Sequence, residues 1–490
     1  MRRMLLVALG AAAIAGCGMS EADAGIGGSP HWSGEPGGAP WHGGEQYQQV
    51  GENPFVETAQ DARATFGVDV DTASYALMRR DLHGGYLPHV DGVRVEEYLN
   101  YFSYGYEPPV DEAFAAHLEA APSPFGEGLH LLRVGLQARS VAERGRANLV
   151  FLVDVSGSMD EPDKLPLVKR TLSILLDELR PDDTVALVVY SGAVGTVLEP
   201  TPASMRSVIQ QAIDRLGASG STNGEGGIRA AYELAQRHFE DQGINRVILA
   251  TDGDFNVGLY GDPLIDLIQE KRASGVYLTT LGFGSGNYNG AQMERLAAHG
   301  NGNYAYVDGI GEAERVVRRD LLSTMVVVAE DTKVQLTFDP QVVKRHRLLG
   351  YENRAIDDDD FVKDDVDTGD VGAGHDVTAL LEIELQPGAL ESDAALATLA
   401  IRYQPPGAAT DTEMTAELRT GDVLASFDEA SASTRFAAAV AEYAEILRRS
   451  SHSIGADFAQ VRAIAAPLVG GDADRAEFVE LVDTAAGIWR

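Results

Sequence analysis

Cysteine is almost missing from this chain of 490 residues, which contains one, Cys17. Secreted domains that depend on disulfides carry cysteines in pairs, so a disulfide framework is excluded. Long hydrophobic runs are also scarce. The apolar run from Met4 to Gly16 is shorter than the roughly 20 residues that a membrane-spanning helix needs. The chain is nevertheless 44% hydrophobic, which excludes a wholly disordered protein and suffices for two or three domains.

Basic residues are few, because 39 Lys and Arg stand against 74 Asp and Glu. The formal net charge is -35, and no Lys- or Arg-rich stretch interrupts the acidity. Nucleic acid is therefore excluded as a partner. The same charge opposes adsorption onto anionic lipid, while divalent cations or a basic protein surface are attracted by it.

The first residues have the pattern of an export signal. Two arginines follow Met1, the apolar run comes next, and Cys17 ends it. The sequence Ile14-Ala15-Gly16-Cys17 resembles a bacterial lipobox, which implies cleavage before Cys17 and acylation of this residue. Acyl chains would hold the exported protein to a membrane. Gly18 after the cysteine favours the outer membrane in a bacterium that has two. The alternative is an ordinary cleaved signal with an incidental cysteine.

Composition divides the rest of the chain. Residues 18–45 are rich in Gly and Pro without apolar periodicity, which predicts a flexible tether. A metal- or carbohydrate-binding patch of His31, Trp32, Trp41 and His42 is the less favoured interpretation of this segment. We expect an N-terminal flanking domain at 46–145, a central domain at 146–325, and a C-terminal domain at 326–490 that is first β-rich and then helical.

The flanking segments contain strands and helices. Residues 65–70 predict a strand, and Asp71 with Ser74 predicts the cap of a helix. The acidic run from Asp69 to Ser74 also has the composition of a second metal site, which is the less favoured alternative. Apolar alternation predicts strands at 115–138 and beyond 325, which we expect to pair in one sandwich around the central domain. Helical periodicity returns at 436–447 and 458–468.

The central domain alternates strands and helices with great regularity. Continuous apolar runs predict strands at 149–155, 184–191, 246–254, 276–284 and 303–308, and amphipathic segments predict helices at 164–180, 204–217, 226–239 and 263–274. This pattern predicts an α/β fold with a doubly wound, mostly parallel sheet. Ligands of such folds bind at the carboxyl ends of the strands.

Oxygen-bearing side chains follow these strands. A D-x-S-x-S sequence ends the first strand, a threonine stands in a Gly-rich loop before a helix, and an Asp-Gly pair ends a later buried strand. Two carboxylates and three hydroxyls suit a hard cation such as Mg²⁺, with Mn²⁺ or Ca²⁺ as alternatives. The candidate metal ligands are Asp154, Ser156, Ser158, Thr222 and Asp252. Asp254 and Asn256 are expected at the rim and not as ligands.

These residues resemble the metal-ion-dependent adhesion site (MIDAS) of von Willebrand factor type A (VWA) domains. The resemblance implies that Ser156 and Ser158 bind the metal directly, that Thr222 binds it directly or through water, and that Asp154 and Asp252 act partly through water. It also implies a protein partner that presents a Glu or Asp to the metal. The segments NPFVETAQDARATFGVDVDTASYALMRR and VRVEEYLNYF resemble the flanking regions of bacterial VWA lipoproteins, whose biological role is largely undefined.

Two other functions stay open. In the first, Ser156 or Ser158 is the nucleophile of a hydrolase. The sequence lacks H-E-x-x-H and places no G-x-S-x-G around either serine, so we expect no enzyme. In the second, the protein is an envelope scaffold that the metal only stabilises. GFGSGN, at Gly282–Asn287, lacks the third glycine of a dinucleotide site and predicts a tight turn.

Overall fold

A computed structural model describes residues 45, 47–141, 143–241, 243–253, 262–286, 288–322, 325–363, 366, 368–408, 410–453, 455 and 457–489. All of them belong to one compact unit, Ala39–Arg490. The predicted signal segment with Cys17 and the predicted tether up to residue 44 lie outside the described residues. Glu45, the last residue of that tether, is buried and pairs with Arg80 at 2.8 Å, so the folded part already includes it.

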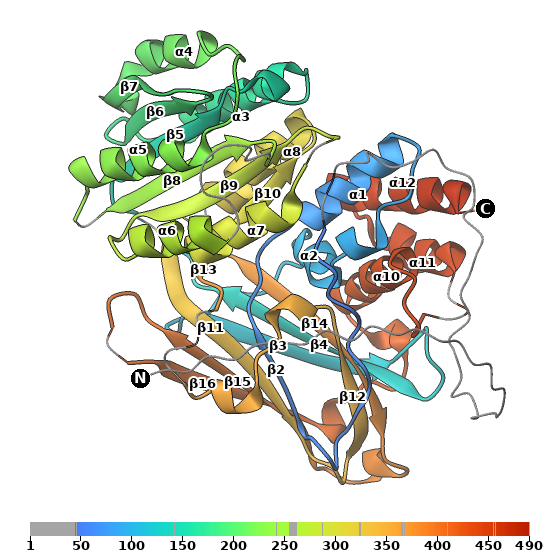
Figure 1. The fold of residues 1–490 in the computed structure, drawn as a ribbon. Helices are drawn as coiled ribbons and strands as arrows, with labels where there is room; N and C mark the ends of the chain where they lie inside the picture. The colour runs from blue at the N-terminus through green and yellow to red at the C-terminus, as the bar shows by residue number, and fades with distance from the viewer. Residues whose placement is uncertain are drawn as a thin grey trace, which may run out of the picture. The chain divides into compact units, whose positions relative to one another are not determined.

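The central module is built on one mixed sheet (Figure 1). Its strands run parallel except β7, which pairs antiparallel with β6 at one edge. The sequence pattern did not predict this edge strand. In spatial order the strands are β10 (Tyr304–Val307), β9 (Tyr277–Phe283), β8 (Ile244–Thr251), β5 (Ala147–Asp154), β6 (Thr184–Tyr190) and β7 (Val194–Pro202).

Helices cover both faces of this sheet. Alternate residues of β5 point to opposite faces: Leu149 and Phe151 lie in one apolar core and Val150 and Leu152 in another. The expected doubly wound fold is therefore confirmed. The helices of the module are α3 (Leu165–Glu178), α4 (Arg206–Asp214), α5 (Gly224–Arg237), α6 (Asp262–Arg272), α7 (Gly290–His299) and α8 (Ile310–Arg315), which continues as the π-helical turn η4 (Val316–Leu321).

The strand order reverses at β5, which determines where a ligand binds. From β5 the chain passes to β6 on one side and later returns to β8 on the other. Asp154 pairs in register with Tyr190 of β6, and Val153 pairs with Ala250 of β8. The carboxyl ends of the three strands therefore lie together at the switch point, where open α/β sheets form their binding crevice.

The flanking segments before and after the central module share two sheets, as expected. β4 pairs with β14 across that insertion, and β2 pairs with β11. The two sheets enclose an apolar core. One has the order β1 (Val56–Glu57), β12 (Val343–Leu349), β14 (Asp376–Leu385), β4 (Leu129–Ala138) and β3 (Phe114–Pro122); the other has β13 (Val371–Gly372), β11 (Val327–Phe338), β15 (Ala395–Gln404) and β16 (Thr412–Arg419), with β2 (Arg63–Gly67) beside β11.

A helical layer covers the outer face of the sheet that contains β4 and β14 (Figure 1). Its core joins Leu131 and Leu380 of that sheet to aromatic residues such as Phe436 and Phe478. The helices of this layer come from the segments before and after the central module, so neither flanking segment forms the layer alone. Its helices are α1 (Ala73–His83), α2 (Val95–Asn100), α10 (Ala432–Leu447), α11 (Phe458–Ala465) and α12 (Ala473–Ile488).

The start of α1 differs from the expected helix cap. Thr72 is the N-cap residue, and its side chain makes no capping hydrogen bond. The Asp71 carboxylate instead accepts a hydrogen bond from the Tyr304 backbone, and the Ser74 N–H donates to Glu97. Tertiary partners replace local capping because α1 begins inside the protein. Arg354 pairs with the carboxylates of Asp69 and Asp71, so an internal guanidinium compensates this acidic run, and we assign no metal there.

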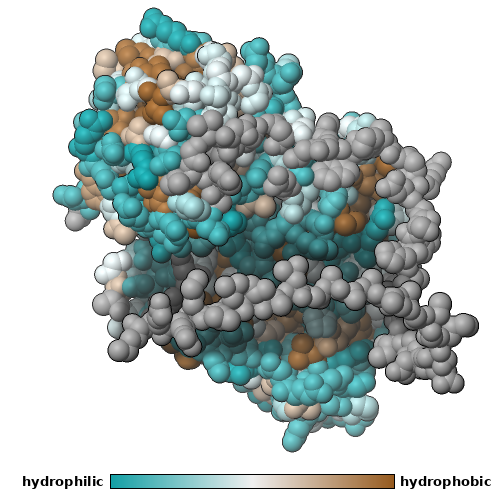
Figure 2. Space-filling view, in the orientation of Figure 1, coloured by the Kyte–Doolittle hydropathy of each residue, from teal (hydrophilic) through white to brown (hydrophobic). Residues whose placement is uncertain are grey.

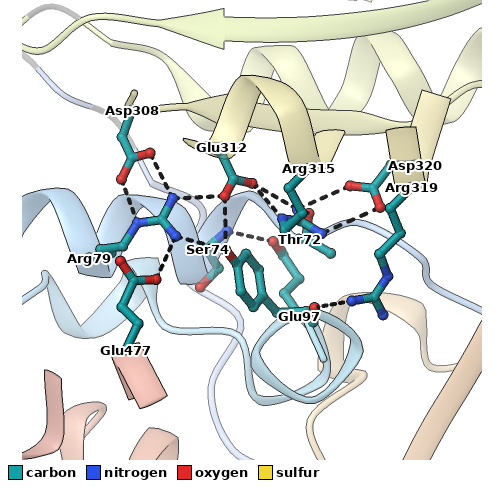
Figure 3. A network of polar contacts seen from close by, with 11 residues as sticks. Thr72, Ser74, Arg79, Glu97, Asp308, Glu312, Arg315, Arg319, Asp320 and Glu477 are labelled. Atoms are coloured by element: carbon teal, nitrogen blue, oxygen red, sulfur yellow. Dashed lines mark hydrogen bonds and ion pairs between the residues drawn. The ribbon is translucent and has the colours of Figure 1, made fainter. Parts of the chain in front are cut away.

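Buried ion pairs join the central module to the helical layer (Figure 3). Arg79 of α1 donates two hydrogen bonds to Asp308, each of 2.7 Å, one of 2.8 Å to Glu312 and one of 3.0 Å to Glu477. Although burial raises it, Arg315 and Arg79 lower the pKa of Glu312 to about 2. The carboxylates and guanidiniums therefore stay ionised together and connect the modules by charge-assisted hydrogen bonds.

Glu442 on α10 makes the stability of the fold pH-dependent. Its burial, together with Glu445 and Glu382, raises its pKa to about 8 although Arg347 lowers it. The folded state therefore holds a proton that the unfolded state releases near pH 4.5, and stability falls as the pH rises from there to about 8. We expect Glu442→Gln to raise the free energy of unfolding by about 4 kcal/mol at pH 8 and to change little at pH 4. Urea titrations at both pH values test this.

The matched control for Glu442→Gln is Glu480→Gln on α12, where the side chain is exposed. We expect this variant to unfold as the wild type does at both pH values. A Glu442→Gln protein no more stable than the wild type at pH 8 would contradict the assignment of a buried, protonated carboxyl group.

The surface is largely hydrophilic on the face that Figure 2 shows, as the acidic composition requires. Hydrophobic side chains gather near α4 and β7, where Val197, Met205 and Val208 are exposed. Among the described residues, no helix is both long and apolar enough to cross a membrane.

Candidate metal centre

Asp154 ends β5 at the switch point and is held from two sides. Its Oδ1 accepts a hydrogen bond of 2.8 Å from the Ser156 N–H, and its Oδ2 accepts one of 2.9 Å from the Thr251 hydroxyl. The side chain is fully buried. One bond is local and the other comes from the end of β8, so the carboxylate is fixed between the two strand ends that the sheet order brings together.

The two serines of the D-x-S-x-S sequence face one another. Ser156 has extended backbone angles, and Ser158 lies in the 3-10 turn η2 (Gly157–Asp160) that follows. Their Oγ atoms are 3.1 Å apart. This proximity is what the spacing of two residues predicts, because an extended residue followed by a tight turn directs both hydroxyls to the same side of the loop.

The loop that carries Thr222 is bonded directly to the serine loop. The Gly157 N–H donates to the Gly220 carbonyl at 3.0 Å, and the Ser219 N–H donates to the Val155 carbonyl at 2.7 Å. Thr222 is buried and precedes Asn223, the N-cap residue of α5. These backbone bonds place the threonine loop against the D-x-S-x-S loop, although the two are far apart in the sequence.

Asp252 follows Thr251 at the end of β8 and is fully buried. Its Oδ2 accepts a hydrogen bond of 3.0 Å from the ammonium group of Lys164, which is also buried. Lys164 is not among the residues that the sequence pattern predicted as ligands. A lysine is an unusual N-cap, a position at which Ser, Thr, Asp and Asn are preferred, and this anomaly before α3 is the signal that points to it.

The electrostatics of the site favour a cation. Burial raises the pKa of Asp154 to about 6, hydrogen bonds from Ser156 lower it, and the charge of Asp252 raises it further. This carboxylate is thus less than fully compensated by its neighbours. A divalent ion would supply the missing charge, and the side chains of all five candidate ligands offer oxygen, which Mg²⁺, Mn²⁺ and Ca²⁺ prefer.

The donor set differs from those of other metal centres. Among the described residues, no group of three or more His, Cys, Asp or Glu side chains is placed to hold a metal. The candidate site is consistent with this, since three of its five ligands are hydroxyls. The residues present therefore fit a hard divalent ion, which Ser156, Ser158 and Thr222 would hold together with the two aspartates.

Among the described residues, no histidine is hydrogen-bonded to Ser156 or Ser158. Their Oγ atoms face one another, the Ser156 N–H donates to Asp154, and the Ser156 carbonyl accepts from the Met159 N–H. An activated serine nucleophile needs an adjacent base. The predicted rim residues Asp254 and Asn256 lie outside the described residues.

The turn predicted at GFGSGN is present, although Asn287 lies outside the described residues. Gly284 and Gly286 have φ of 77° and 97°, in the left-handed region that glycine tolerates. A side chain at Gly284 would collide with the stem of Lys164. The lack of a side chain at Gly284 therefore makes room for Lys164, and this contact explains the glycine without a bound nucleotide.

The fold and the site define a VWA domain, and the family comparison agrees. The family model described as "von Willebrand factor type A domain" matches residues 148–319, and the one described as "von Willebrand factor" matches residues 42–133. Domains of this type typically mediate protein–protein interactions, often through a metal ion. A third family model, described as "Uncharacterized protein YfbK, C-terminal", matches residues 323–488.

The particular family follows from a relative of similar length. The chain is 38% identical over 476 residues to "Uncharacterized protein YfbK" of Escherichia coli (strain K12), with 91% of this chain and 82% of that protein covered. The chain therefore belongs to the YfbK family of VWA domain proteins. It is also 27% identical over 261 residues to human inter-alpha-trypsin inhibitor heavy chain H3, of which it spans 28%.

Solved structures are similar at low sequence identity. The VWA protein of Catenulispora acidiphila is 17% identical, with a TM-score of 0.45, and the match covers 79% of this chain and 91% of that one. Proximal thread matrix protein 1 of the mussel byssus, described with a zinc-occupied MIDAS motif, is 18% identical with a TM-score of 0.32. That match covers 37% of this chain and 48% of the mussel protein.

Proposed function

We propose that this protein is a membrane-anchored module that binds a partner protein through a divalent metal ion, Mg²⁺ or else Mn²⁺ or Ca²⁺. The main support is that three segments meet at the switch point of the sheet. Asp154 at the end of β5 accepts hydrogen bonds from Ser156 and from Thr251 at the end of β8, and backbone hydrogen bonds join the serine loop to the loop before α5. Ser156, Ser158 and Thr222 would hold the ion together with Asp154 and Asp252.

Neutral hydroxyls give the site its binding property. A metal ion held by hydroxyls and two carboxylates keeps more of its charge than one in a cage of carboxylates alone. Such an ion attracts an anionic group from outside, which in a protein partner is the carboxylate of a Glu or Asp. The chain's own residues would orient the ion, and the surrounding loops would select the partner by shape.

The membrane anchor is the second part of the proposal. Acylation of Cys17 after export would attach the protein to the cell membrane, or to the outer membrane where there are two. Two or more acyl chains give firm attachment. The position of the lone cysteine at the end of the apolar run supports this, and the Gly-rich segment that follows would separate the metal centre from the lipid.

Thr222→Ala tests whether binding depends on the centre. We expect the variant to bind Mg²⁺ at least about tenfold more weakly, because one hydroxyl ligand is lost, and to lose metal-dependent capture of envelope proteins. Ser221→Ala is the matched control, since Ser221 is exposed beside it, and should behave as the wild type does. Calorimetry and affinity capture with Mg²⁺ or EDTA are the measurements. Stabilisation by metal without metal-dependent capture would instead support the scaffold alternative.

A further inference from the structure

We propose that Lys164 is a built-in competitor of the metal ion, whose ammonium group takes the place of a cation at Asp252 when the site is metal-free. The inference rests on the proposed metal centre and adds a control on its affinity. Two buried groups of opposite charge form the pair, with Lys164 Nζ 3.0 Å from Asp252 Oδ2. A buried ammonium is costly unless it is paired, so this contact holds the side chain inside the site.

The backbone turn after β9 leaves room for the Lys164 side chain. The stem of Lys164 crosses Gly284 so closely that a Cβ there would collide with three of its carbon atoms. Gly284 also has φ of 77°, which other residues rarely adopt. The turn after β9 therefore provides a channel that brings an aliphatic stem from the start of α3 to the end of β8.

The position of Lys164 at the helix start is unfavourable on local grounds. It is the N-cap residue of α3 and makes no side-chain capping bond. A positive charge at a helix N-terminus is disfavoured by the helix dipole. Ser, Thr, Asp or Asn would stabilise the helix better at this position, because their side chains accept hydrogen bonds from the backbone N–H groups of the first turn. Among the contacts of the described residues, the pair with Asp252 favours a lysine at this position.

The charge of Lys164 lowers the net negative charge of the metal centre. Of the described residues, Asp154 and Asp252 bring two negative charges to the centre, and Lys164 compensates one of them. An incoming divalent ion thus meets a net charge of about one unit instead of two, and must share Asp252 with the ammonium group or displace it. The lysine accordingly stabilises the metal-free domain and weakens metal binding, which makes loading reversible.

The test is Mn²⁺ binding to the full chain in detergent, measured by calorimetry and by electron paramagnetic resonance of the free ion. Lys164→Met keeps the aliphatic stem and removes the charge. We expect it to bind Mn²⁺ about tenfold more tightly than the wild type. Its melting temperature without metal should lie several degrees below that of the wild type and should recover when Mn²⁺ is added.

The control is Lys169→Met, which makes the same charge change on α3 with a side chain that bonds the Asp214 carbonyl at the surface. It should leave Mn²⁺ affinity unchanged. If the wild type binds Mn²⁺ and Lys164→Met binds it no more tightly, or if Lys169→Met has the same effect, the competitor role is wrong and the metal centre stands. If neither the wild type nor Lys164→Met binds Mn²⁺, the proposed centre fails and the inference fails with it.

Discussion

Asp154→Asn is expected to reduce Mg²⁺ and Mn²⁺ affinity by more than about 100-fold while the protein stays folded. The substitution keeps the size of the side chain and an oxygen that can accept from the Ser156 N–H, but removes a full negative charge from a buried site. The domain is stabilised mainly by the two apolar cores on either side of the sheet. Metal binding and folding are therefore separable at this position.

Asp160→Asn is the control for this experiment, because Asp160 belongs to the same turn and is exposed. Calorimetric titration of the wild type and both variants, with circular dichroism of each, measures binding and folding independently. Asp160→Asn should bind as the wild type does. Retention of wild-type affinity by Asp154→Asn would show that the ion binds elsewhere, and loss of its folded spectrum would show that Asp154 is structural.

The second large effect is expected at the buried junction between the modules. Arg79→Ala leaves Asp308 and Glu312 without their shared guanidinium (Figure 3). Breaking a buried ion pair by removing one partner costs about 3 to 5 kcal/mol, because the remaining charges stay desolvated. We therefore expect the urea midpoint of the protein to fall markedly. An early transition of the central module apart from the flanks would indicate that these pairs couple the modules.

Arg318→Ala is the control for the junction. Arg318 lies in the adjacent turn η4 and pairs with Glu178 at the surface, where its side chain is 56% exposed. Solvent screens such a pair, so the urea midpoint should not change. Equal midpoints for Arg79→Ala and the wild type would contradict the account of the junction and leave the metal centre untouched.

The sequence predicted the elements whose pattern is local and strong. Continuous apolar runs predicted β5, β8 and β9, which are buried on both faces. The edge strand β7 was missed because its residues are mostly half-buried or exposed and it ends at a proline. The helix α12 lies in the C-terminal stretch expected to be helical, but its bounds were not predicted because its small alanines dilute the apolar stripe that marks an amphipathic helix.

The contacts of the site were likewise predictable from the sequence only where they are local. Asp154 ends β5, and Ser156 and Ser158 follow it within four residues, so their spacing predicted that the serine hydroxyls meet. Lys164 pairs with Asp252 across 88 residues, and Arg79 pairs with Glu312 across 233. No local pattern specifies such partners, because they depend on the strand order and on how the flanks interleave. An anomalous N-cap at Lys164 was the one local trace of these contacts.

The most direct test of the account is to locate the ion. Crystals of the folded part of the protein grown with Mn²⁺ would give an anomalous difference peak at the metal position. The account predicts one peak at the carboxyl end of β5, in contact with the hydroxyls of Ser156 and Ser158. A Mn²⁺ peak bound away from these hydroxyls, or no peak at a saturating concentration of Mn²⁺, would contradict it.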